Sequence, residues 1–401
     1  MKEIGVGILG FGTVGAGVAE GLLRNRKLMA ERLGVDIVLK RIADLDITTD
    51  RGVRVDPDVL TTDAQAVIAD PDVRIVVETI GGTGVARTFV LAALNAGKAV
   101  VTANKKLLAE YGKEIFDTAR KNGVDIYFGA SVGGGIPIIR SLREGLAGNE
   151  ILQIHGILNG TCNYILTRME NEGKPFDEVL ADAQKLGYAE ANPSLDIDGF
   201  DTAHKACILS ALAYGFQPSL DQVQIEGIRN LSGIDVRYAA DFGYRIKLLA
   251  VVARHDADIE VGVHPTLVPF SHMLASVNGV FNAAMVRGDL VGDTLFYGRG
   301  AGRLPTASTV IGDIGDIVSR FYLRFMVAAR AGSFGTISTT LGNHGVSISA
   351  ATQKDEDGGG TGFVPVVVLT HPAPAKALDA ALAEIAQAGV VGETPIRLRM
   401  L

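Results

Sequence analysis

The fold of the first part of the chain is indicated by one segment, Ile4-Gly5-Val6-Gly7-Ile8-Leu9-Gly10-Phe11-Gly12-Thr13-Val14-Gly15. Its apolar run Ile4–Leu9 predicts a buried strand, and Gly10–Gly15 fits the pattern G-x-G-x-x-G. In that pattern the first glycine permits a tight turn, the second lets backbone approach a pyrophosphate, and the third lets helix and strand pack closely. The helix that follows directs its N–H groups and dipole at the phosphates. A glycine-rich turn without a ligand is the alternative, but this context favours dinucleotide binding.

The next hundred residues alternate short apolar runs with helical apolar spacing. Such alternation predicts a parallel sheet with helices on both faces, a Rossmann-type domain over residues 1–132. The further predicted strands are Val35–Ala43, Ile75–Thr79, Ala99–Thr102 and Val124–Phe128, and the predicted helices include Ala16–Arg32 and Val85–Ala96.

The rest of the chain divides into two less regular parts. Residues 133–304 predict an α+β domain for catalysis and dimerisation, and a helix at 305–320 completes the first domain. Its predicted elements are a helix from Pro137, the strand Ile151–Asn159, the helices Asp177–Leu186 and Asp201–Tyr214, and β segments in Ile246–Val268. Residues 321–401 predict a compact βαββα unit with strands Tyr322–Ala328, Val346–Thr352 and Val364–Thr370, helices Gly335–His344 and Ala375–Ala388, and a glycine-rich turn at Asp357–Gly362.

Composition excludes several classes of protein. Of the 401 residues, 47% are hydrophobic and 21% charged, as in soluble globular proteins. The formal net charge of −7 and the lack of a basic tract argue against nucleic-acid binding. We expect no signal peptide and no membrane span. The two cysteines, Cys162 and Cys207, cannot form a disulfide framework, so we expect a cytoplasmic protein.

The residue at the end of the second predicted strand bears on the choice between NAD and NADP. Asp44 stands where a carboxylate would bind a ribose 2′-OH and repel a 2′-phosphate, although it lies further along than the usual spacing. Asp44 could equally be a turn residue, and Lys40 and Arg41 could hold a 2′-phosphate instead. NAD and NADP both remain open, and the aspartate favours NAD.

The densest polar segment is Gly187–Lys205, which leads into a predicted helix. Asp201 and Lys205 are four residues apart and share one helix face. The apolar residues after Lys205 predict partial burial, which lowers a lysine pKa and suits proton transfer. Glu190 and Asp201 could bind a substrate ammonium group. A capped helix with a structural ion pair is the alternative.

Three further stretches could carry chemistry. Lys105, after the strand that ends at Thr102, could contact cofactor or an anionic substrate, or simply start a solvated helix. Cys162 could be a nucleophile, but a buried thiol fits its surroundings better. The loop Gly298–Ser308 could direct N–H groups at the cofactor or merely connect domains.

Together these residues resemble the homoserine dehydrogenase family. The resemblance covers residues 1 to about 320, and the tail is similar to the βαββαβ ACT module. The matching motifs are Gly10–Gly15, Val101–Lys105, Ala130–Pro137, Asn159–Asn163, Ala183–Lys205 and Gly300–Ser308.

The resemblance implies reversible NAD(P)H-dependent reduction of L-aspartate 4-semialdehyde to L-homoserine, on the way to threonine, methionine and isoleucine. It implies that Lys205 transfers the proton and that Lys105 polarises the carbonyl. The implied substrate-binding residues are Glu190, Asp201, Asp196 and Thr161. The expected cofactor-binding residues are Gly10, Phe11, Gly12, Thr13, Val14, Gly15, Asp44, Thr79, Lys105, Gly187 and Gly302.

Some positions depart from the family pattern. Gly129 replaces a glutamate that helps to hold a monovalent cation, which leaves carbonyls of Val132, Gly134 and Ile136 as candidate sodium ligands. Ala43 replaces an arginine found in NADP-using relatives, which favours NAD. Ala329 and Ala331 differ from the usual residues of an ACT turn, and this bears on whether an amino-acid effector binds there.

Two other hypotheses remain beside this one: an aldehyde-acylating dehydrogenase that uses Cys162, and a silent sensor of a dinucleotide and an amino acid. Intact Lys105, Lys205, Glu190 and Asp201 argue against the sensor. In every case we expect a homodimer or homotetramer, because the second and third segments both offer sheet surfaces that commonly pair.

Overall fold

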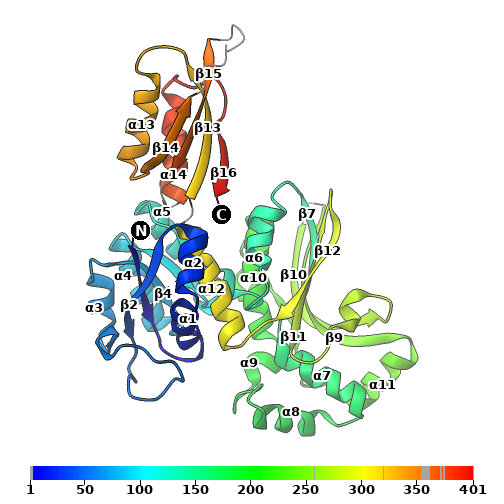
Figure 1. Ribbon diagram of the computed structural model, residues 1–401. Coiled ribbons are helices and arrows are strands. Elements are labelled where there is room, and N and C mark those ends of the chain that lie inside the picture. The colour runs from blue at the N-terminus through cyan, green and yellow to red at the C-terminus, as the bar shows by residue number, and fades with distance from the viewer. Residues whose placement is uncertain are drawn as a thin grey trace.

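The computed structural model describes residues 3–256, 258–318, 320–353, 362–370, 373 and 375–400. These residues form three sheets, each with its own helices, so that three units are visible in Figure 1. The α/β class predicted from the sequence is confirmed. No helix in the described ranges is both long and apolar enough to cross a bilayer.

Sheet A is the parallel sheet that the sequence predicts. Its six strands are all parallel and lie in the order β3-β2-β1-β4-β5-β6, the order of a doubly wound nucleotide-binding sheet. The order reverses between β1 and β4, and ligands of such sheets bind at the carboxyl edge beside that point. The strands are β1 (Glu3–Leu9), β2 (Asp36–Ala43), β3 (Leu60–Thr61), β4 (Val73–Glu78), β5 (Ala99–Thr102) and β6 (Ile126–Tyr127).

Helices cover both faces of sheet A, and one of them comes from far along the chain. Helix α12 packs against α1 at Gly17 and Gly21, where a Cβ would lie within 2.5 Å of atoms of Arg303 and Ile311. The predicted helix Ala16–Arg32 is in fact two helices, because the backbone leaves helical geometry at Asn25. The helices are α1 (Thr13–Arg24), α2 (Arg26–Leu33), α3 (Ala64–Ala69), α4 (Gly84–Asn95), α5 (Lys105–Lys121) and α12 (Arg303–Ile317), with the short turn η1 (Pro57–Val59).

Sheet B is mixed and has the strand order β12-β11-β7-β9-β10-β8. All neighbours are antiparallel except β8 and β10. The β segments predicted in Ile246–Val268 are two long strands, β9 and β10, which form a hairpin. The strands are β7 (Ile151–Ile157), β8 (Gln224–Ile225), β9 (Tyr244–His255), β10 (Asp258–Pro269), β11 (Phe281–Gly288) and β12 (Gly292–Arg299). The helices and short turns are η2 (Gly129–Ser131), α6 (Ile138–Arg140), η3 (Ser141–Gly145), α7 (Gly160–Glu172), α8 (Phe176–Lys185), α9 (Ser194–Ile197), α10 (Phe200–Tyr214), η4 (Leu220–Gln222), α11 (Gly233–Asp241) and η5 (Met273–Ser276).

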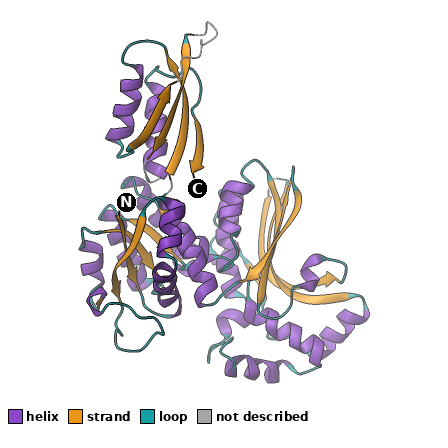
Figure 2. Ribbon diagram, viewed as in Figure 1, coloured by secondary structure: helices purple, strands orange, loops and turns teal. Residues whose placement is uncertain are grey.

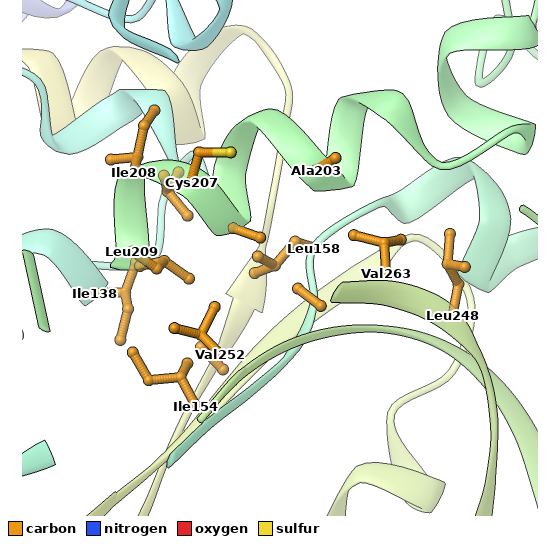
Figure 3. Close-up of a cluster of buried hydrophobic side chains, with 14 of the residues drawn as sticks. Ile138, Ile154, Leu158, Ala203, Cys207, Ile208, Leu209, Leu248, Val252 and Val263 are labelled. Atoms are coloured by element: carbon orange, nitrogen blue, oxygen red, sulfur yellow. The ribbon is translucent and has the colours of Figure 1, made fainter. Parts of the chain in front are cut away.

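Helix α10 lies against one face of sheet B and buries an apolar stripe there (Figure 3). Ala203 and Leu209 on this helix are 0% exposed and belong to the same cluster as Ile154 and Val252 of the sheet. This packing fixes the helix that carries the buried polar residues Asp201 and Lys205.

Helix α7 was not predicted, because the strand was expected to run on to Asn159. The strand ends at Ile157, and Asn159 instead caps α7 by accepting a hydrogen bond from the Cys162 N–H at 2.8 Å.

Sheet C is antiparallel, with the order β14-β15-β13-β16, and both of its helices lie on one face (Figure 2). The element order is the βαββαβ pattern expected for the tail. Of the predicted glycine-rich turn, only Gly362 is among the described residues. The elements are β13 (Arg320–Ala328), α13 (Ser333–Asn343), β14 (Ile348–Gln353), β15 (Phe363–Thr370), α14 (Ala375–Gln387) and β16 (Ile396–Met400).

Candidate active site

A cavity of about 570 Å³ lies where the carboxyl edge of sheet A meets helices α7 and α10. Both predicted catalytic lysines line it, although they are one hundred positions apart in sequence. The remaining predicted residues in its wall are Val14, Thr161, Gly187, Asp196, Asp201, Gly134 and Gly302. Residues from both halves of the chain therefore meet in one cavity.

The glycine-rich turn has the backbone geometry that a dinucleotide needs. Gly10 has a φ of +97°, and a Cβ there would lie 2.8 Å from the carbonyl carbon of Thr79. A Cβ at Gly12 would meet no heavy atom within 4 Å, so a ligand can approach the backbone there. The Thr79 hydroxyl donates to the Gly10 carbonyl at 2.8 Å and holds the turn in place. These residues fit a bound dinucleotide at the N-terminus of α1.

Asp44 lies beside this turn. One of its carboxylate oxygens accepts a hydrogen bond from the Phe11 N–H at 2.5 Å, and the other accepts one from the Asp46 N–H at 2.9 Å. Asp44 is thus both a turn residue and a neighbour of the cofactor loop. Lys40 instead pairs with Glu3, and Arg41 binds the Asp70 carboxylate at 3.2 Å.

One carboxylate joins the two lysines. Asp201 accepts from the Lys105 Nζ at 2.7 Å through one oxygen and from the Lys205 Nζ at 2.7 Å through the other. Lys105 is the first residue of α5, whereas Asp201 and Lys205 lie one turn apart on α10. The predicted pair on a single helix face is therefore part of a three-residue bridge, whose third residue, Lys105, comes from another unit of the chain.

Asn159 holds the acidic side of this bridge. Its side-chain amide donates to Asp201 at 3.0 Å and to Asp196 at 2.6 Å. The sequence motif contained Asn159, but we gave it no role. Its position at the end of an apolar run was the available signal, because asparagine is a favoured helix cap.

The pKa values of the two lysines shift in opposite directions. The Lys205 side chain is 10% exposed, and burial lowers its pKa despite the adjacent Asp201 carboxylate. The Lys105 side chain is 40% exposed; burial also opposes its charge, but Asp201 outweighs this and raises the pKa of Lys105. For Asp201 the two ammonium groups outweigh burial and hold its pKa well below the usual range. Burial and the nearby Asp201 charge raise the pKa of Asp196.

The other predicted substrate residues differ in their placement. The Thr161 hydroxyl donates to the Tyr188 carbonyl at 2.6 Å, next to Gly187 in the cavity wall. Glu190 is exposed and is not among the residues that line the cavity, although its charge helps to raise the pKa of Lys105.

Cys162 does not have the features of a nucleophile. Its side chain is 0% exposed, and burial together with nearby carboxylates raises the pKa of its thiol well above the ordinary value. The Sγ lies 3.2 Å from the Asp196 carbonyl. Cys162 is therefore a buried thiol, the alternative that the sequence analysis favoured over a nucleophile.

Two of the three candidate sodium ligands, the carbonyls of Gly134 and Ile136, already have protein partners. The Gly134 carbonyl accepts from the Thr309 hydroxyl at 2.7 Å, and the Ile136 carbonyl accepts from the Ile138 N–H at 2.9 Å. The nearest carboxylate to Gly129 belongs to Asp313, which accepts the Gly129 N–H at 2.8 Å. A Cβ at position 129 would lie 2.7 Å from that carboxylate, so no larger residue fits there without rearrangement.

A dinucleotide turn beside a cavity with two lysines and a carboxylate defines an NAD(P)-dependent oxidoreductase that acts on a CH–OH group. Three family models match this chain: "Homoserine dehydrogenase, NAD binding domain" at residues 10–129, "Homoserine dehydrogenase" at 137–314 and "ACT domain" at 321–387.

Similar proteins agree with these models over the whole chain. Homoserine dehydrogenases of Synechocystis sp. and Neisseria gonorrhoeae are each 43% identical, with 99% and 100% of this chain and 99% of each relative covered. The crystal structure of the Thiobacillus denitrificans enzyme is 41% identical with a TM-score of 0.76, and covers 100% of this chain and 99% of its own. The chain therefore belongs to the homoserine dehydrogenase family, which interconverts L-aspartate 4-semialdehyde and L-homoserine. This confirms the resemblance, including the ACT module.

Proposed function

We propose that Lys205 is the residue that transfers the proton in this reaction and that Lys105 stabilises the charge on the reacting oxygen. The observation that carries the proposal is the bridge of Asp201 to both ammonium groups at 2.7 Å inside the cavity. When bound, the nicotinamide supplies the hydride for reduction and accepts it in oxidation.

The different surroundings of the two lysines match these roles. A lysine with a lowered pKa gives up and regains its proton more readily near neutral pH, as a general acid and base must. A lysine that stays charged suits a site where negative charge develops on oxygen. Asp201 keeps both ammonium groups at one place, and Asn159 fixes the direction of the Asp201 carboxylate.

The amino-acid part of the substrate would lie on the Asp196 side of the cavity. Asp196 and Asp201 offer negative charge to its ammonium group, and Thr161 lies at the N-terminus of α7, where a carboxylate is favoured. Glu190 would have to turn inward from its exposed position to bind the substrate, as its place in the motif implies.

For the cofactor we propose NAD rather than NADP. Asp44 sits at the end of β2 beside the glycine turn, where its charge opposes a 2′-phosphate, and Lys40 and Arg41 are engaged with other carboxylates. The other residues that would hold the dinucleotide are those of the turn itself, Thr79, Lys105, Gly187 and Gly302. An archaeal relative, solved in complex with NADPH, is 30% identical with a TM-score of 0.66, and its match covers 78% of this chain and 96% of its own.

The direct test is the initial rate of L-homoserine oxidation with NAD⁺ and NADP⁺ in parallel wells. We expect activity with NAD⁺ well above that with NADP⁺. A preference for NADP⁺ would mean that the 2′-phosphate is bound by cationic side chains despite the charge of Asp44. Absence of turnover in protein that still binds a dinucleotide would favour the sensor hypothesis.

The remaining proposals concern partners and context. We propose a cytoplasmic homo-oligomer, a homodimer or homotetramer, and a monomer seen by light scattering at micromolar concentration would contradict it. Binding of an amino-acid effector to the ACT unit is a further proposal, testable by adding threonine to the assay.

We assign no sodium ion, because the carbonyls of Gly134 and Ile136 have protein donors and position 129 has no carboxylate. Equal activity in sodium and choline salts is the expected result. The unit boundaries at 132, 304 and 320 remain proposals as well.

A further inference from the structure

Lys247 is a fully buried cation outside the bridge of Lys105, Asp201 and Lys205. It lies on β9 and is 1% exposed. Its Nζ donates to the Val277 carbonyl at 2.5 Å, to the Asn163 Oδ1 at 3.1 Å and to the Asn278 Oδ1 at 3.2 Å. An ammonium group has three N–H donors, so the charged form satisfies all three acceptors and a neutral amine leaves one of them without a hydrogen.

The acceptors belong to a network that ties one loop to helix α7. The Asn163 amide donates to the carbonyls of Gly279 and Phe281 at 3.0 and 3.1 Å. The Thr167 hydroxyl accepts the Gly279 N–H at 3.0 Å. The segment Val277–Phe281 is therefore held by one strand lysine and two helix side chains.

This segment forms part of the wall of the active-site cavity. Val280 lines the cavity, and a Cβ at Gly160 would lie only 2.8 Å from the Val280 carbonyl. Gly160 follows Asn159, the residue that holds Asp196 and Asp201. Movement of the segment would thus reach the first turn of α7 and the acidic side of the site.

The residue after the segment lines the cavity, and its side-chain oxygen has no partner among the described residues. Asn282 also lines the cavity and is 1% exposed. Its Oδ1 has no hydrogen-bond partner among the described residues. A Cβ at Gly300 would lie 2.0 Å from the Asn282 side chain, so glycine at 300 leaves room for this amide. A buried amide oxygen without a partner indicates a contact that a bound ligand completes.

We propose that Lys247 is a positioning residue for substrate binding: it holds Val277–Phe281 against α7, so that Asn282 and the first turn of α7 meet the amino-acid substrate. Lys247 itself is not among the residues that line the cavity, and it acts through the segment. Burial lowers the pKa of Lys247 to about 8, with Glu170 on α7 opposing and Arg245 on β9 adding to this effect. The hold on the segment therefore weakens above that pH.

The test compares two kinds of buried lysine. Lys247→Met removes the donors at similar size. Lys98→Met is the matched control, because Lys98 is also buried (8% exposed) and donates to two carbonyls, of Asp70 and Val73, away from the cavity. We expect Lys247→Met to raise the KM for L-homoserine about tenfold and to leave the KM for NAD⁺ within about twofold. Lys98→Met should lower the melting temperature and leave the KM for L-homoserine unchanged.

A pH series separates positioning from simple loss of stability. Titration of Lys205 and of the substrate affects both proteins and cancels in the ratio of kcat/KM between wild type and Lys247→Met. We expect this ratio to fall toward one as the pH rises from 7 to about 9.5, since the wild type then loses the same charge. A ratio that stays constant with pH, or an equal rise in KM in the Lys98 variant, would overturn the proposal.

A second variant covers the case in which Lys247→Met does not fold. Thr167→Val removes the acceptor of the Gly279 N–H and, with it, the hydroxyl that donates to the Asn163 backbone carbonyl at 2.6 Å. It keeps the Lys247 contacts, so it should raise the KM for L-homoserine by a smaller factor with NAD⁺ binding intact. A wild-type KM in folded Thr167→Val would also overturn the proposal.

Discussion

Replacing Asp201 by asparagine tests the bridge between the two lysines directly. The substitution keeps the size of the side chain and removes its charge. Both ammonium groups lie 2.7 Å from the carboxylate, so each loses its counter-charge, and the two cations still face one another. Lys205 is affected more, since its side chain is 10% exposed and that of Lys105 is 40% exposed to screening solvent.

The size of the effect follows from this geometry. An opposite charge within about 4–6 Å changes a pKa by about 1–3. Burial already lowers the pKa of Lys205, and Asp201 is the largest influence that opposes this. Its removal should therefore lower the pKa of Lys205 by about a further 1–3. A change of one in pKa corresponds to about 1.4 kcal/mol.

The assay is the pH dependence of kcat in both directions. In the proposed mechanism, reduction requires Lys205 with its proton, so activity should be lost on the alkaline side as the lysine deprotonates. Oxidation then requires Lys205 without its proton, so activity should be lost on the acid side. In Asp201→Asn both limits should move to lower pH by about 1–3. The pH of each limit is the quantity to compare between wild type and variant, because the maximum rate of the variant will also fall.

Asp198→Asn is the matched control for this experiment. Asp198 lies three residues away, pairs with Arg229 at 2.7 Å and does not line the cavity. Its replacement should leave both limits where they are. Circular dichroism must show that Asp201→Asn is folded, since breaking a buried pair can cost about 3–5 kcal/mol. Limits that stay fixed in folded Asp201→Asn, or that move to higher pH, would refute the assignment of Lys205.

Four further predictions concern single residues. Lys205→Ala should cut turnover by about 10²–10⁴ with cofactor affinity little changed, and near-normal turnover would remove Lys205 from its role. Cys162→Ala should keep homoserine oxidation within a few-fold, because the thiol is buried and protonated; loss of activity would revive the acylating hypothesis. Asp44→Ala should lower kcat/KM for NAD⁺ about tenfold and that for NADP⁺ much less, and equal losses would exclude a ribose contact. Burial raises the pKa of Asp313 to about 7 from an ordinary 3.8. The charged carboxylate is therefore less stable in the folded protein than in the unfolded chain, and this lowers the free energy of unfolding at pH values where the carboxylate is charged. Wild-type stability should therefore fall as the pH rises from about 4 to above 7, and Asp313→Asn should gain up to about 4 kcal/mol on the wild type between pH 5 and 8, as measured by urea unfolding; parallel pH curves would contradict this.

Local patterns predicted the elements that depend on neighbouring residues. The strand–glycine–helix start and the four-residue spacing of Asp201 and Lys205 are local, and both are confirmed by the structure. The burial of Lys205 also followed from the apolar residues after it. The break at Asn25 and the cap at Asn159 were missed, because both depend on how the chain turns rather than on apolar spacing.

Contacts between distant segments could not be predicted from spacing. The pairing of Lys105 with Asp201 depends on α5 and α10 meeting across two units, and no periodicity in either helix encodes that meeting. The exposure of Glu190 is a similar case, since the motif groups it with residues that line the cavity. The Lys247 network escaped the sequence for the same reason: its members lie on β9, on α7 and in a loop about thirty residues further on.

Two lysines that share one carboxylate in one cavity nevertheless have pKa values that shift in opposite directions. Asp201 attracts both, so attraction alone would make them alike. The difference arises from position, because Lys105 starts a helix at the open edge of sheet A and Lys205 lies within a helix packed on sheet B. Burial then lowers the pKa of one lysine while the pKa of the other is raised. Pairs of groups pushed apart in this way are typical of acid–base sites, and here the separation is built by the meeting of two units rather than by either one.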